Sequence, residues 1–102
     1  MGLLNRRSEP QSNEKVEKEI TILNRLGMHA RPSAMFVRVA GRFRCEIWVS
    51  KEGEEVNGKS IMGLMMLAAG QGSKLCVRAE GPDAAEAVRE IEALIDSRFN
   101  EE

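Results

Sequence analysis

The sequence predicts an α+β fold, an open-faced sandwich of two layers whose strands and helices follow one another as βαββαβα. Two observations lead to this prediction. Four short segments place apolar and polar residues on alternate positions, which is the pattern of a strand with one buried face. Three other segments begin at residues that cap or open helices, and the last of them repeats its apolar residues with a helical period. Since a sheet that is apolar on one face needs helices to cover that face, the elements form two layers around one core.

The four predicted strands are short, and each has one apolar face. Ile20 and Ile22 share the buried face of the first strand, and Cys45 and Ile47 begin the buried face of the second. Residues 51–54 contain a glycine between charged residues and predict a hairpin turn to the third strand. The predicted strands cover residues 16–22, 45–50, 55–57 and 75–80.

Two of the helices are predicted from the residues at their starts. Pro32 has a fixed φ and no backbone N–H, so it suits the first turn of a helix that continues over residues 33–40. Ser60 stands where its hydroxyl can cap a second, short helix over residues 61–67. Gly70 follows this helix and favours its end.

The last helix has the clearest pattern. Asp83 is its expected N-cap residue, and Glu86 three positions later completes the pattern of a capping box. Seven apolar residues share one face of the predicted helix. They are Ala84, Ala87, Val88, Ile91, Leu94, Ile95 and Phe99.

The chain is expected to hold one domain. Its 102 residues suffice for one modest core and are too few for two. Residues 1–15 are polar, mixed in charge and without periodicity, so we expect a flexible N-terminal tail before a domain over residues 16–102.

Composition excludes several classes of function. With 15 basic and 16 acidic residues and 4% aromatic residues, the chain lacks the charge and the stacking surface of a nucleic-acid-binding protein. One histidine and two distant cysteines give no metal-ligand spacing, so no metal is expected. Cys45 is predicted to point inward and Cys76 outward, which argues against a disulfide. No segment resembles a membrane span or a signal peptide, so we expect a cytoplasmic protein without membrane insertion.

The most informative residues surround the only histidine. Gly27 suits a sharp turn from strand to helix, and Pro32 opens the helix, so His29 is expected at the helix N-terminus. Unpaired backbone amides, among them that of Ala30, and the positive end of the helix dipole meet at this place. The guanidinium of Arg31 lies two residues away. Together these groups predict a cradle for a phosphoryl group on or beside the imidazole.

Imidazole chemistry suits transient phosphoryl transfer. An uncharged ring has a nitrogen lone pair that can act as a nucleophile near neutral pH. We expect the helix N-terminus and Arg31 to disfavour the cationic ring and to stabilise the charge of the phosphorylated product. These residues do not decide which of the two ring nitrogens reacts. No cofactor is needed for this chemistry.

Three segments together resemble HPr, the histidine-containing phosphocarrier family of the bacterial phosphotransferase system. They are residues 27–32 around His29, residues 59–63 (Lys-Ser-Ile-Met-Gly) and residues 80–84 (Glu-Gly-Pro-Asp-Ala). The resemblance covers about residues 16–99 and implies a four-stranded antiparallel sheet of order 1-4-2-3 with three helices on one face. It further implies that Enzyme I, charged by phosphoenolpyruvate, phosphorylates His29 on Nδ1, and that His29 passes the group to IIA domains.

The same resemblance assigns a second set of residues. In this family, the serine that corresponds to Ser60 is a regulatory phosphorylation site for a dedicated kinase/phosphorylase in many bacteria. The family uses the neighbouring surface to dock its partners, which implies roles for Ile61, Met62, Gly63 and Met65. Leu64 and Leu67 can supply the buried face of this helix, so that Met62 and Met65 face solvent.

Other functions remain open at this point. One is a regulatory binding module, gated by Ser60, that docks on a transcriptional regulator or an enzyme. Relatives that have left transport usually lack the active histidine, whereas His29 is present here, which favours phosphotransfer. Another is a nitrogen-related branch of the same relay, in which the carrier serves regulators instead of sugar permeases. Nothing in the sequence separates that branch from the sugar branch. We expect the carrier to be a monomer.

Overall fold

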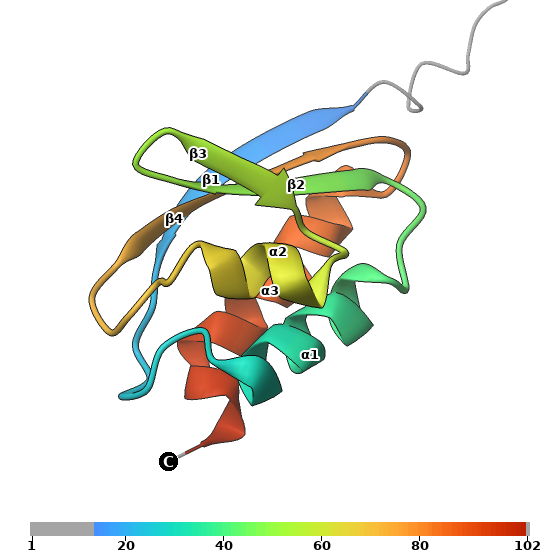
Figure 1. Ribbon diagram of the computed structural model, residues 1–102. Coiled ribbons are helices and arrows are strands. Elements are labelled where there is room, and N and C mark those ends of the chain that lie inside the picture. Colours follow the sequence, from blue (N-terminus) through green and yellow to red (C-terminus); the bar gives the residue numbers. More distant parts are fainter. Residues whose placement is uncertain (1–13, 102) are drawn as a thin grey trace, which may run out of the picture.

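The structure is a computed structural model that describes residues 14–101 (Figure 1). Most of the expected N-terminal tail, residues 1–13, lies outside this range. The strands are β1 (Lys15–Thr21), β2 (Glu46–Lys51), β3 (Glu54–Asn57) and β4 (Lys74–Glu80). The helices are α1 (Ala30–Ala40), α2 (Ile61–Met66) and α3 (Ala84–Asp96), followed by one short turn, η3 (Arg98–Asn100).

The elements form the expected two-layer sandwich. The strands make one antiparallel sheet in the order β1-β4-β2-β3. The three helices lie together on one face of this sheet (Figure 1). The predicted element order, sheet order and layer arrangement are therefore confirmed.

Alternation along the strands sets their register. Ile20 of β1 stands opposite Leu75 of β4, and both are buried beneath the helices. Between β2 and β3, Glu52 and Gly53 both have positive φ, of 53° and 87°. Two such residues form the type of two-residue turn whose twist matches that of the strands it joins, as the predicted hairpin requires.

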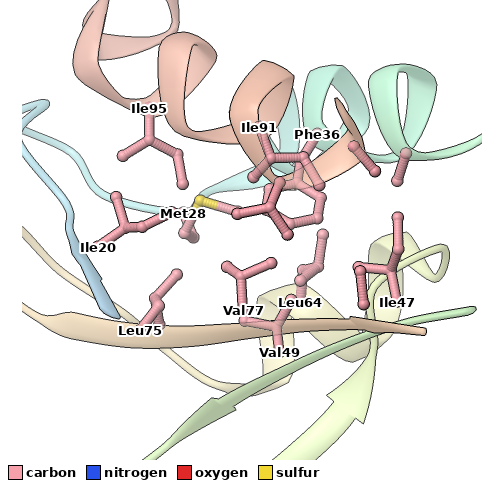
Figure 2. Close-up of a cluster of buried hydrophobic side chains, with 14 of the residues drawn as sticks. Ile20, Met28, Phe36, Ile47, Val49, Leu64, Leu75, Val77, Ile91 and Ile95 are labelled. Atoms are coloured by element: carbon pink, nitrogen blue, oxygen red, sulfur yellow. The ribbon is translucent and has the colours of Figure 1, made fainter. Parts of the chain in front are cut away.

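One continuous core fills the space between the layers. Figure 2 shows side chains from α1 and α3 pointing toward side chains that rise from the sheet and from α2. Those labelled are Ile20, Met28, Phe36, Ile47, Val49, Leu64, Leu75, Val77, Ile91 and Ile95. Met28 is the residue directly before the histidine, so the candidate site is anchored in this core from its own loop.

The last helix ends earlier than its apolar stripe predicted. α3 stops at Asp96, and Phe99 lies in η3, where it is still fully buried. The hydroxyl of Ser97 donates to the carbonyl oxygen of Leu94 at 2.7 Å, next to the point where the chain leaves the helix. The prediction that Phe99 belongs to α3 is wrong, although its burial was predicted correctly. Among residues 14–101, no helix combines the length and the apolar character needed to cross a bilayer.

The start of α3 differs from the predicted capping box. Asp83 occupies the N-cap position, but its side chain makes no capping hydrogen bond. It accepts hydrogen bonds from the backbone amides of Arg44 at 2.9 Å and Cys45 at 3.0 Å instead. Burial opposes ionisation of Asp83, but these two donors hold the pKa of the carboxyl below its usual value. Asp83 thus connects α3 to the segment that enters β2, and the expected pairing with Glu86 is wrong.

The two cysteines lie where alternation placed them. Cys45 is buried and Cys76 is partly exposed on the opposite face, and both are free thiols. Burial, together with a hydrogen bond to Asp83, raises the pKa of the Cys45 thiol to about 11. The raised pKa disfavours the reactive thiolate, so we interpret Cys45 as a packing residue of the core rather than as a reactive thiol. No group of three potential metal-binding side chains occurs within residues 14–101.

The sheet face away from the helices is polar and ion-paired. The guanidinium of Arg78 lies 4.2 Å from the centre of the Trp48 ring. The same guanidinium pairs with Glu80 at 2.7 Å and with Glu55 at 2.9 Å. Arg78 therefore makes a cation–π contact with Trp48, the only tryptophan of the chain, and two carboxylates hold the guanidinium in place.

Replacing Asp83 tests its role as a connection between α3 and β2. Asp83→Ala leaves two backbone amides without their acceptor, and we expect a loss of about 1–3 kcal/mol in the free energy of unfolding at pH 7. The lowered pKa means that this stabilisation is present above the ordinary carboxyl pKa and is lost as pH falls through the folded-state pKa. Urea unfolding should therefore show a smaller difference between the proteins at pH 3 than at pH 7. Asp96→Ala, at the exposed end of α3, is the matched control; a pH-independent difference for Asp83→Ala would contradict this role.

Candidate functional site

His29 stands directly before α1, as expected from the sequence. It is the N-cap residue, with φ of −76° and ψ of −169°, and its carbonyl oxygen accepts a hydrogen bond from the Ser33 amide at 3.0 Å. The first amides of a helix have no partner within it, and Pro32 has no amide at all. The amides of Ala30 and Arg31 therefore have no partner within the helix, at the end where His29 stands. The side chain of His29 is 36% exposed, so the ring can be reached from solvent.

The loop before His29 is held by the segment that follows α2. The amide of Met28 donates to the carbonyl oxygen of Ala69 at 2.8 Å, and the buried Ser33 hydroxyl donates to the carbonyl oxygen of Met28 at 3.1 Å. Gly27 has φ of +69°, and a Cβ there would clash with the carbonyl oxygen of Ala69. Only glycine fits this close approach, which places the loop before α1 against the segment that follows α2.

Glu101 contacts the ring, a contact that sequence reasoning missed. Its Oε2 lies 2.9 Å from Nε2 of His29, and its side chain is 14% exposed. A neutral ring that donates this hydrogen bond carries its proton on Nε2 and leaves the lone pair on Nδ1. The two residues are 72 positions apart, and no local pattern marks Glu101 among the acidic residues at the end of the chain.

Asn24 supports the same carboxylate from below. The residue is fully buried, and its Nδ2 donates to the carbonyl oxygen of Gly27 at 2.8 Å and to Oε1 of Glu101 at 3.1 Å. Each oxygen of Glu101 therefore has its own partner, Asn24 on one side and His29 on the other. Sequence reasoning also missed Asn24.

Arg31 has an exposed side chain on the first turn of α1. It lines a shallow hollow together with Arg25, Leu26 and Glu101. The carboxylate that contacts His29 thus lies in the same hollow as two arginines. The sequence analysis expected one cation here, Arg31, and the structure adds a second, Arg25. Two cations in this hollow favour the binding of an anionic group.

Several of the α2 residues singled out in the sequence are exposed to solvent. Met62 is 73% exposed, and Ile61, Met65 and Met66 are also exposed, whereas Leu64 and Leu67 are buried as expected. Met65 lines a hollow that also includes His29 and the Ala68–Gly70 segment. An apolar, solvent-facing surface therefore borders the imidazole.

Ser60 caps α2 as predicted. Its Oγ accepts a hydrogen bond from the amide of Gly63 at 3.0 Å. The Lys59 ammonium donates to the carbonyl oxygen of Phe43 at 2.8 Å, which ties this turn to the segment before β2. Ser60 is partly exposed beside Ile61, at the border of the apolar surface.

Comparison with known proteins shows what the chain resembles. A family model described as the PTS HPr component phosphorylation site matches residues 16–97. The chain is 48% identical over 86 residues to phosphocarrier protein HPr of Neisseria meningitidis, covering 84% of this chain and 97% of that protein. The crystal structure of HPr-C-His from Thermoanaerobacter tengcongensis matches with a TM-score of 0.83 at 47% identity, covering 85% of this chain and 98% of that one. The HPr-like protein Crh of Halalkalibacterium halodurans is 47% identical over 81 residues, or 79% of this chain and 96% of that protein.

The fold and these matches define a phosphocarrier of the phosphotransferase system. The chain belongs to the HPr family. The expectation drawn from the three sequence segments is thereby confirmed at the level of the family.

Replacing Gly27 tests the close approach between the loop before α1 and the segment that follows α2. Gly27→Ala adds a Cβ against the carbonyl oxygen of Ala69 at a residue with positive φ. We expect a loss of about 2 kcal/mol in stability, or roughly 10 °C in Tm. Gly72→Ala is the matched control, because Gly72 has φ of +89° but nothing within 4 Å of an added Cβ. Equal losses for the two variants, measured by thermal unfolding, would contradict the importance of the Ala69 contact.

Proposed function

We propose that the protein relays a phosphoryl group through His29. It receives the group from phosphorylated Enzyme I, which phosphoenolpyruvate charges, and passes it to IIA domains of the sugar phosphotransferase system. The observation that carries the proposal is the reachable imidazole before α1, with its Nε2 hydrogen-bonded to Glu101. Membership of the HPr family supports the same relay.

The hydrogen bond at Nε2 supports Nδ1 as the reacting nitrogen. Nδ1 of the neutral ring attacks the phosphorus atom, and the bond between phosphorus and the donor atom of Enzyme I breaks, returning the electron pair to that donor. Attack makes the His29 ring positive, because Nδ1 has spent its lone pair while Nε2 keeps its proton. The Glu101 carboxylate at 2.9 Å stabilises that charge.

The helix start supplies a weak anion site for the phosphoryl oxygens. Amides of Ala30 and Arg31 and the guanidinium of Arg31 are the groups we assign to it. Each contact of this kind contributes roughly 0.3–1 kcal/mol at an exposed position. Weak binding suits a carrier, since a tightly held phosphoryl group would not be handed on.

The exposed side chains of α2 are proposed as the partner-docking surface. Ile61, Met62 and Met65 are exposed on this short helix, and the partly exposed Gly63 lies between them in the sequence. Flexible and polarisable methionines can adapt to several partners of different shape. The hollow that Met65 shares with His29 would bring a docked partner to the ring.

A second function rests on Ser60. Similarity to the HPr-like protein Crh favours a regulatory branch in addition to phosphotransfer. In this branch, a Ser60-specific kinase/phosphorylase modifies the carrier, which then docks on a transcriptional regulator; a nitrogen-related relay to regulators is the other form of this alternative. Phosphate on Ser60 would lie at the start of α2 and leave the fold unchanged, because the charge suits the helix N-terminus.

Phosphorylation of the purified protein tests the relay. Incubated with Enzyme I and labelled phosphoenolpyruvate, the chain should accept one acid-labile, base-stable phosphoryl group, and His29→Ala should accept none. Arg31→Ala should accept the group more slowly while its thermal unfolding stays close to that of the unmodified chain. Label that survives in His29→Ala would move the site to another residue and overturn the proposal.

Two substitutions of Ser60 separate its structural and regulatory roles. Ser60→Asp keeps an oxygen for capping and adds a negative charge. We expect phosphoryl acceptance from Enzyme I to slow roughly fivefold, because this charge must be desolvated when a partner covers the surface. Ser60→Ala adds no charge and removes the cap, so it should accept phosphate normally while losing about 1 kcal/mol of stability. Initial rates and thermal unfolding measure the two effects. Equal slowing in both variants would contradict the regulatory role.

A further inference from the structure

Asn24 is a fully buried polar residue that none of the HPr-like segments contains. Its amide orientation is fixed, because Nδ2 faces two acceptors, the carbonyl oxygen of Gly27 and Oε1 of Glu101. Its Oδ1 is buried and has no hydrogen-bond partner among the described residues. A buried acceptor without a partner costs free energy that an apolar residue of similar size would avoid. The role of Asn24 therefore lies in the two hydrogen bonds that its Nδ2 group donates.

One of these hydrogen bonds connects Asn24 to His29 through the carboxylate of Glu101. Oε1 of Glu101 accepts from Asn24 at 3.1 Å, and Oε2 lies 2.9 Å from Nε2 of His29. A carboxylate with both oxygens engaged cannot rotate freely, so the buried amide fixes the oxygen that faces the ring. The three side chains come from the loop after β1, the start of α1 and the end of the chain.

The chain adopts an unfavourable turn to bring Glu101 to this place. Arg98, Phe99 and Asn100 have φ of 60°, 55° and 58°, a left-handed conformation that residues with a Cβ seldom adopt. Burial of Phe99 holds the turn, and the amide of Glu101 donates to the carbonyl oxygen of Arg98 at 3.0 Å. Backbone strain of this kind concentrates at functional sites, where surrounding contacts maintain it.

We propose that Asn24 is a positioning residue for the phosphoryl acceptor and acts through Glu101. By holding the carboxylate, Asn24 keeps the His29 proton on Nε2 and the lone pair on Nδ1. It also keeps the carboxylate next to the positive ring that forms on attack. This inference rests on the proposed function of His29, but its effect on the ring exists before any phosphoryl group arrives.

The first test observes the ring of the unphosphorylated protein. Imidazole ¹⁵N chemical shifts at a pH where the ring is neutral report which nitrogen carries the proton. In the unmodified protein we expect the proton on Nε2, and in both Asn24→Leu and Glu101→Ala we expect the two nitrogen shifts to move toward each other as the tautomers mix. Unchanged shifts in Asn24→Leu would overturn the proposal, even if His29 is phosphorylated normally.

The second test asks whether Asn24 acts through Glu101. Each single variant should lower kcat/KM for phosphoryl acceptance from Enzyme I about fivefold, the loss of one hydrogen bond. The double variant should be no slower than Glu101→Ala alone, because Asn24 has nothing to position once the carboxylate is gone. Losses that multiply would show that Asn24 acts independently of Glu101, through the Gly27 loop, and would overturn the proposal.

Controls distinguish failure of the Asn24 proposal from misfolding of a variant and from failure of the proposed function. Glu86→Ala removes an exposed carboxylate at the opposite end of α3 and should change neither the ring shifts nor the rate. Should Asn24→Leu fail to fold, Asn24→Ala replaces it in both tests. If the unmodified protein accepts no phosphoryl group, the proposed function fails, while the ring shifts still decide whether Asn24 and Glu101 set the tautomer.

Discussion

The close approach of Gly27 to Ala69 is the contact on which the site depends. A positive φ at Gly27 lets the loop pass against the backbone that follows α2, and the Met28 amide closes the contact with a hydrogen bond of 2.8 Å. Since His29 comes next, this contact also sets where the imidazole stands relative to the exposed methionines of α2. The imidazole and an adaptable apolar surface thus become neighbours, although one stands at the start of α1 and the other belongs to α2.

The site is completed by the end of the chain. Glu101 contacts His29 only because α3 crosses the sheet, stops at Asp96 and turns left-handed with Phe99 buried in the core. Packing of an apolar residue therefore supports the place of a carboxylate two positions later. This arrangement links stability and chemistry, because loosening the core beneath η3 would also loosen the group that faces the ring.

The surroundings of His29 suit the proposed transfer, in which a phosphoryl group must both arrive and leave. The helix amides and the two exposed arginines attract an anion. The hollow is shallow and the ring is 36% exposed, so the anion is not enclosed. In the proposed relay, Glu101 and Asn24 position the ring, so that the reacting atom is well defined while the phosphoryl oxygens stay weakly held. Precise placement of the proposed nucleophile is compatible with weak binding of the phosphoryl group, because different residues would provide the two properties.

The sequence by itself determined the features that arise from near neighbours along the chain. Alternation predicted the strands, Pro32 and Ser60 marked two helix starts, and Gly27 with Pro32 placed His29 before a helix. Only the tertiary structure decided the partners of distant side chains. Asp83 satisfies two amides near β2 instead of its own helix, and Glu101 meets residues 72 and 77 positions away. Periodicity and capping act over one or two turns, whereas these partners depend on how complete elements pack together.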